Sequence, residues 1–161
     1  MTAPLGPRRF DLAALSPDDF EALCVRLARL EVSGVTGTRA PDGGADALLR
    51  DPAGGYQRAW QAKSHRRIDW RKCRESLDRA VKIYGVVHFT FCFSVDPTST
   101  DLSQLEKLRK RHPDVEVDHW GASEIVGRLT ETADGRGDLL LRRPLGVGGD
   151  DRSCGAGRRR A

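Results

Sequence analysis

The stretch "VVHFTFCFSV", residues 86–95, most constrains what this chain can fold into. Most of its residues are β-branched or aromatic, which indicates a β-strand, and they show no regular alternation of apolar and polar positions. That pattern is typical of a strand buried on both faces of a sheet. Helical patterns precede and follow it, over residues 69–84 and 98–112. The stretch therefore predicts an α/β fold in which it is a central strand.

The first helix is predicted over residues 15–31 by its start signals. Ser16 fits the N-cap and Pro17 the first helical position, and two aspartates then suit the positive end of the helix dipole. One apolar face follows at helical spacing: Phe20, Leu23, Cys24 and Leu27. Glu21 lies at the margin of that face.

Short strand patterns follow over residues 33–40, 45–50 and 56–63, and "DPAGG" between the last two predicts a hairpin. Asp69 fits the N-cap of a second helix with one apolar face: Trp70, Cys73, Leu77, Ala80, Val81 and Tyr84. After the central strand come a helix with the stripe Leu102, Leu105 and Leu108, a strand over 115–120 and a helix over 122–130. This order predicts a three-layer α/β sandwich, with an antiparallel hairpin and later strands joined by helical crossovers in one mixed sheet.

The length of 161 residues fits one domain with a substantial core. We expect a flexible N-terminus over residues 1–11, the domain itself over 12–131, and a linker or terminal element over 132–145. The Gly/Arg-rich segment 146–161 has little apolar surface to bury, so it is expected to be disordered.

Composition excludes two classes of protein. No apolar run approaches the roughly 18 residues that span a bilayer, and "MTAPLGPRRF" lacks the apolar region of a secretory signal. A cytoplasmic location is therefore the expectation. The four cysteines are widely spaced, so we expect reduced, mostly buried thiols rather than zinc ligands or disulfides: Cys24, Cys73, Cys92 and Cys154.

Positive charge is concentrated in one segment. Residues 63–82 contain eight Lys/Arg and three acidic residues, an excess of five positive charges, whereas the whole chain carries +4. A solvated helix face is the ordinary reading of such a run, and its position directly after "QAK" favours a polyanion partner. The residues expected to contact phosphates are His65, Arg66, Arg67, Arg71, Lys72 and Arg74, with solvation alone the more ordinary role of His65.

A group of polar residues is expected at one end of the sheet. Gln61 and Lys63 share one face of their strand because side chains alternate, and Trp60 and Ala62 share the other. In the hairpin, Asp46 at the start of one strand lies opposite the end of its neighbour. The first helix can bring Glu21 over the same end.

Such a group suits metal-assisted hydrolysis of a phosphodiester. Mg²⁺ prefers oxygen ligands, and Asp46, Gln61 and the backbone carbonyl of Ala62 would supply three. Lys63 would hold or polarise the attacking water and offset charge in the transition state. Glu21 would bind a second metal directly or through water.

The motifs "PDGGAD" (41–46), a hairpin turn and "QAK" (61–63), preceded by a helix with "FEALC" (20–24), resemble the PD-(D/E)xK nuclease superfamily. The pattern is most similar to its Mrr-like, type IV restriction endonuclease branch, in which glutamine commonly replaces the acidic residue before x-Lys. The resemblance covers roughly residues 12–130. It implies a restriction-endonuclease-like fold, Mg²⁺-dependent DNA cleavage and catalytic roles for Asp46, Gln61 and Lys63, with Glu21 matching the helix-one glutamate. For Asp42, in the turn, we expect a role in turn geometry rather than in catalysis.

Each of these residues also has an ordinary structural role. If these roles are purely structural, Asp46 caps a turn, Gln61 hydrogen-bonds to the backbone, and the Lys63 side chain extends into solvent from the end of its strand. His88, within the apolar strand, is expected to be a hydrogen-bonded core histidine. Trp70 and Trp120 are expected to be packing residues rather than platforms for bases.

The sequence therefore predicts a DNA endonuclease dependent on Mg²⁺ or Mn²⁺, acting in restriction or anti-phage defence. One alternative is a non-catalytic nucleic-acid-binding module. Another is the nuclease effector domain of a larger defence protein with an NTPase sensor, in which "LLLRRPLGVGG" (139–149) starts a linker. A homodimer or larger oligomer and a target-recognition partner are compatible with each reading. The sequence leaves open the DNA target and the choice between DNA and RNA.

Overall fold

The structure, a computed structural model, describes residues 11–38 and 43–133. A short 3₁₀ turn, Leu12–Ala14, precedes the first helix. The remaining elements follow in chain order: α1 Pro17–Glu31, β1 Val35–Gly37, β2 Ala47–Arg50, β3 Tyr56–Lys63, α2 Trp70–Tyr84, β4 His88–Phe93, α3 Ser99–Arg111, β5 Glu116–Trp120 and α4 Ala122–Ala133. The predicted order of helices and strands is confirmed.

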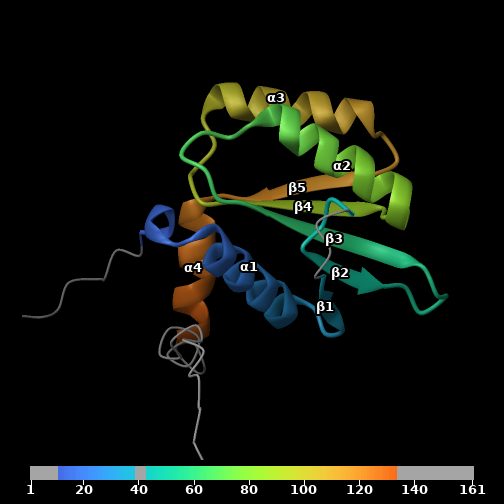
Figure 1. The fold of residues 1–161 in the computed structure, drawn as a ribbon, viewed down its shortest axis with the longest axis horizontal. Coiled ribbons are helices and arrows are strands. Elements are labelled where there is room, and N and C mark those ends of the chain that lie inside the picture. Colours follow the sequence, from blue (N-terminus) through green and yellow to red (C-terminus); the bar gives the residue numbers. More distant parts are fainter. Residues whose placement is uncertain (1–10, 39–42, 134–161) are drawn as a thin grey trace, which may run out of the picture.

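The five strands form one mixed sheet in the order β1-β2-β3-β4-β5. β1, β2 and β3 pair antiparallel, whereas β3, β4 and β5 run parallel and are joined by α2 and α3. Helices α2 and α3 cover one face of the sheet, and α1 and α4 lie against the other (Figure 1). The predicted three-layer α/β arrangement is therefore present.

Two apolar clusters fill the spaces between the layers. Under α2 and α3 the core includes Leu48, Ala59, Leu77, Phe89, Phe91, Phe93, Leu105 and Val117. Under α1 and α4 it includes Phe20, Cys24, Leu27, Ala47, Trp60, Cys92, Trp120 and Ile125. Alternate residues of β3 and β4 belong to opposite clusters because side chains alternate across a strand. This alternation places Trp60 toward α1 and α4.

The helices begin where side chains cap them. The Ser16 hydroxyl accepts from the Asp19 N–H at 3.1 Å, and the Asp69 carboxylate accepts from the Lys72 N–H at 3.1 Å. Thr98 and Asp101 form a reciprocal capping box at α3. Because Asp69 fixes the first turn of α2, the loop between β3 and α2 is only six residues long, over 64–69.

Two expectations about packing are wrong. Leu102 is 44% exposed, because α3 packs on the sheet through the buried residues Leu105 and Leu108 and its first turn extends past them. His88 is hydrogen-bonded as expected, to Asp118 of β5, but it lies partly exposed at the start of β4 rather than in the core. The packing role of Trp70 and Trp120 is confirmed, since both belong to or pack on the apolar clusters.

Cys24, Cys73 and Cys92 are buried free thiols, as predicted, and Cys154 lies outside the described residues. Asp42, residues 1–10 of the expected flexible N-terminus and residues 134–161 also lie outside them. Asp11 caps the 3₁₀ turn, and α4 continues to Ala133, two residues into the expected linker or terminal element. Within residues 11–38 and 43–133, none of the helices has the length and apolar character needed to cross a membrane.

Contacts at both ends of α2 and α3 hold the two helices together. At one end the Trp70 indole N–H donates to the Asp101 carboxylate at 2.8 Å. Further along, Arg111 donates from Nε and Nη2 to the two oxygens of Asp78, at 2.9 and 2.8 Å. His112 Nε2 lies 2.6 Å from Asp78 Oδ1. α2 and α3 are therefore fixed side by side.

We expect Asp78→Asn to lower stability at neutral pH by about 1 kcal/mol or less, since the pair is solvent-accessible and screened. The hydrogen bonds from Arg111, then those from His112, lower the pKa of Asp78 below its ordinary value of 3.8. A lowered folded-state pKa contributes stability that is present above the unfolded value and is lost as pH falls through the folded value. Thermal unfolding of both proteins should therefore differ at pH 7 and converge in the acid range. A difference that persists at low pH would contradict this origin.

Candidate active site

Asp46 lies just before β2, where the chain enters the sheet between β1 and β3. Its backbone N–H donates to the Trp60 carbonyl at 2.8 Å, and its carbonyl accepts from the Thr38 N–H at 2.8 Å. The register Ala47↔Trp60 in the hairpin places Asp46 beside Gln61. Backbone pairing on both sides therefore fixes the position of the Asp46 carboxylate.

The Asp46 carboxylate binds the end of β3. Its Oδ2 atom accepts from the Ala62 backbone N–H at 2.7 Å and from the Gln61 Nε2 amide at 2.9 Å. The same Gln61 amide nitrogen lies 3.3 Å from the Ala62 carbonyl oxygen. The predicted meeting of Asp46 and Gln61 is confirmed, and the contact includes the backbone of Ala62.

Lys63 points to the other side of this group. Its ammonium donates to the Ser76 hydroxyl on α2 at 2.8 Å, so it lies on the α2 side of the sheet. Burial lowers the pKa of Lys63, while the nearby Asp46 charge acts to raise it. Lys63 is thus close enough to Asp46 for electrostatic coupling, but in this structure its hydrogen-bond partner is Ser76.

Glu21 on α1 interacts electrostatically with Asp46. Burial first, and then the negative charge of Asp46, raise the pKa of the Glu21 carboxyl. Burial also raises the pKa of Asp46, against the opposing effects of the Ala62 N–H, Lys63 and Gln61. Glu21 on α1 is therefore near enough to Asp46 for their charges to interact, and its place in a metal site stays a prediction. Both carboxyl groups thus have raised pKa values, which is frequent at functional sites.

The backbone conformation and close packing at Gly44 require a glycine two residues before Asp46. Its φ of +72° is in the left-handed region, and a Cβ atom there would lie 2.3 Å from the backbone oxygen of Ser76. Only glycine lets the loop approach α2 this closely. Ser76 of α2 thus makes two contacts with the site. Its backbone packs closely against Gly44, and its hydroxyl accepts a hydrogen bond from Lys63.

No family model, curated protein or solved structure matches this chain. The geometry of the site is therefore the basis for any functional conclusion.

The residues around Asp46 fit a divalent cation such as Mg²⁺. The Gln61 amide nitrogen lies within hydrogen-bonding distance of both Asp46 Oδ2 and the Ala62 carbonyl oxygen. The Asp46 carboxylate oxygen and the Ala62 carbonyl oxygen thus both lie next to the positively polarised Gln61 N–H group. A bound cation needs oxygens that converge in this way. A cation at this point would displace the Gln61 amide nitrogen, and the amide oxygen of the displaced side chain would then be the third ligand. Carboxylate, amide and carbonyl oxygens are the donors that Mg²⁺ prefers.

A second group of possible metal ligands lies at the opposite end of β4 and β5. One ligand atom from each of His88, Glu116 and Asp118 lies within 4.8 Å of the others. His88 Nε2 is 2.9 Å from Asp118 Oδ2, and His88 Nδ1 is 3.9 Å from Glu116 Oε2. An imidazole with carboxylates suits Mn²⁺ or Zn²⁺ better than Mg²⁺. A direct His–Asp hydrogen bond accounts for the present contact without a metal.

The predicted phosphate-contacting residues are all exposed. His65, Arg66 and Arg67 lie in the loop after β3, and Arg71, Lys72 and Arg74 lie on the first two turns of α2. This loop directly follows Lys63, so the positive charges begin next to the Asp46 group.

Sequence reasoning missed Ser76, because a serine in a helix has no pattern that reveals its partner on another element. It also missed the cluster of His88, Glu116 and Asp118, which depends on the parallel register His88↔Glu116 and Thr90↔Asp118. Alternation along residues 116–118 was the available signal, because it puts Glu116 and Asp118 on one face of their strand.

Proposed function

We propose that this chain is a nuclease with a restriction-endonuclease-like fold that hydrolyses phosphodiester bonds in DNA with Mg²⁺ or Mn²⁺. The observation that carries the proposal is the convergence of Asp46 Oδ2 and the Ala62 carbonyl oxygen on one point beside Gln61. The sequence resemblance to the Mrr-like branch of the PD-(D/E)xK nucleases concerns these same residues. Restriction of foreign DNA is the biological role that the resemblance favours.

The chain's own residues have distinct roles in this proposal. Asp46, Gln61 and the Ala62 carbonyl would hold the metal, and Glu21 would bind a second ion or its water ligands. A bound divalent ion supplies an activated water and offsets the charge of the phosphate. Lys63 donates toward the attacking water or the phosphate oxygens, and Ser76 keeps its ammonium positioned between turnovers. Arg66 and Arg67 contact phosphates next to the cleaved bond.

Cleavage of supercoiled plasmid and methylated genomic DNA tests this function. We expect nicked or linear products with MgCl₂ or MnCl₂ and none with EDTA. Salt-sensitive DNA binding without cleavage, under all metals and oligomeric states tested, would favour a non-catalytic binding module. The absence of both binding and cleavage would overturn the proposal.

Measuring metal affinity in single variants shows which group of residues binds the metal, the one around Asp46 or the cluster of His88, Glu116 and Asp118. We expect Asp46→Asn to weaken Mn²⁺ binding, measured by titration calorimetry, by at least about tenfold, because it removes the one charged ligand that the site fixes by two hydrogen bonds. His88→Gln should leave the affinity of this site unchanged. Loss of binding in His88→Gln and not in Asp46→Asn would move the metal to the cluster of His88, Glu116 and Asp118.

A further inference from the structure

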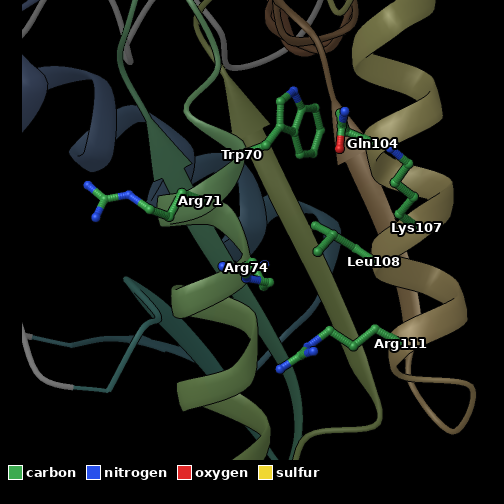
Figure 2. A pocket seen from close by; sticks show the side chains of 7 residues that line it. All are labelled: Trp70, Arg71, Arg74, Gln104, Lys107, Leu108 and Arg111. Carbon is green, nitrogen blue, oxygen red and sulfur yellow. The ribbon is translucent and has the colours of Figure 1, made fainter.

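A hollow of about 460 Å³ opens between α2 and α3, on the outer side of these helices. Trp70, Arg71 and Arg74 line it from α2, and Gln104, Lys107, Leu108 and Arg111 line it from α3. Figure 2 shows Trp70 and Arg74 on one wall opposite the α3 residues on the other, with Arg71 at the rim pointing away from α3. We name this feature the α2–α3 groove.

The lining of the α2–α3 groove carries four cations and no acidic side chain. Asp78 partly neutralises Arg111 through their paired hydrogen bonds. Arg71, Arg74 and Lys107 form no ion pair with any residue in the described ranges. Arg74 and Lys107 thus face the hollow from opposite walls without an ion-pair partner, which suits an anion between them.

The walls of the groove are held at a fixed separation. The Trp70–Asp101 hydrogen bond closes one end, and the Asp78–Arg111 pair lies at the other. Trp70 is also packed edge-on against Phe93, with ring centroids 5.8 Å apart. A ligand therefore binds without first ordering the two helices, which lowers the entropic cost of binding.

The groove begins close to the candidate active site along the chain. Trp70, at its entrance, begins α2 seven residues after Lys63, and the intervening loop carries exposed His65, Arg66 and Arg67. Arg66 and Arg67 thus lie in the chain segment that joins Lys63 to the groove, where the acidic Asp69 serves as the N-cap of α2. A single phosphate or nucleotide needs no such extended track, whereas a polynucleotide backbone does.

We propose that the α2–α3 groove binds the sugar–phosphate backbone of the substrate DNA on one flank of the cleaved bond. This inference rests on the proposed function and adds Lys107 and Arg111 of α3 to the DNA-binding surface. The contacts fall on phosphates, so they contribute affinity and position the duplex without reading its sequence. Two hydrogen bonds to Asp78 fix the Arg111 side chain in the lining of the groove.

The test measures binding of a fluorescein-labelled 20-base-pair duplex by anisotropy over a range of KCl, with Ca²⁺ in place of Mg²⁺ to suppress cleavage. We expect Arg74→Ala and Lys107→Ala each to weaken binding about five- to tenfold at low salt and to reduce the salt slope by about 1, as loss of one phosphate contact does. Matched controls are Arg79→Ala on α2 and Lys110→Ala on α3, which are exposed residues outside the groove. Both should retain nearly the wild-type slope.

The outcomes separate this inference from the proposed function. If wild-type protein binds and cuts DNA but the two groove variants match the two controls, the groove proposal fails and the nuclease stands. If wild-type protein cuts no DNA but the groove variants still lose binding, the groove stands and the catalytic proposal fails. Absence of any salt-dependent binding by wild-type protein overturns both. Thermal unfolding of each variant confirms that the fold is retained.

Discussion

Lys63→Met lowers the rate of DNA cleavage by about a thousandfold or more, the largest effect on activity that we expect from one substitution. Lys63, at the end of β3, is an ammonium group whose charge acts on the Asp46 carboxylate, and its burial strengthens its interaction with developing negative charge. Methionine keeps a comparable length and apolar stem, so the packing against α2 is preserved. Single-turnover cleavage of a defined duplex measures the effect on the chemical step.

Two measurements distinguish catalysis from structure in this variant. Mn²⁺ binding and the unfolding temperature should stay close to the wild-type values, since Lys63 is not a proposed metal ligand. Lys82→Met, at an exposed position near the end of α2, is the matched control and should cut DNA at the wild-type rate. If Lys63→Met cuts DNA within about threefold of wild type, far less than one electrostatic contact supplies, the proposed site is wrong.

Gly44→Ala destabilises the protein by about 2–4 kcal/mol, the largest effect on stability that we expect near the site. The new Cβ atom would lie 2.3 Å from the backbone oxygen of Ser76, and the φ of +72° disfavours any side chain. The loop must therefore move away from α2 or α2 must shift. Because Asp46 follows two residues later, either movement also displaces its carboxylate from Ala62 and Gln61. Cleavage should fall about a hundredfold, the cost of a small misplacement of a catalytic group.

Gly85→Ala provides the matched control. Gly85 also has a positive φ, +62°, but a Cβ atom there meets nothing within 4 Å. This variant should lose only about 1–2 kcal/mol from backbone strain and keep its cleavage activity. Urea denaturation of the two variants isolates the contribution of the close approach to Ser76. Equal losses of stability would show that the contact between the loop and α2 is not what Gly44 is needed for.

Local patterns in the sequence were sufficient for the elements and much of the fold. Ser16, Asp69 and Thr98 cap the helices because their side chains compete for nearby backbone N–H groups, which is a matter of a few consecutive residues. The apolar stretch 86–95 and the "DPAGG" turn predicted a buried strand and an antiparallel hairpin. Leu102 shows the limit of periodicity, because helical spacing says which side a residue lies on and not where along the helix its contacts stop.

In the candidate site, too, contacts between residues close in the chain were predictable and contacts between distant elements were not. The sequence by itself placed Asp46 opposite Gln61, since hairpin register and strand alternation follow from residues close together in the chain. Only the tertiary structure decided that Lys63 meets Ser76, that His88 meets Asp118, and that Arg74 faces Lys107 across a groove. These contacts join elements far apart in sequence, and their geometry depends on how helices settle against the sheet to fill its core. No local sequence pattern encodes the position of a helix relative to the sheet, because that position is set by the packing of the whole domain.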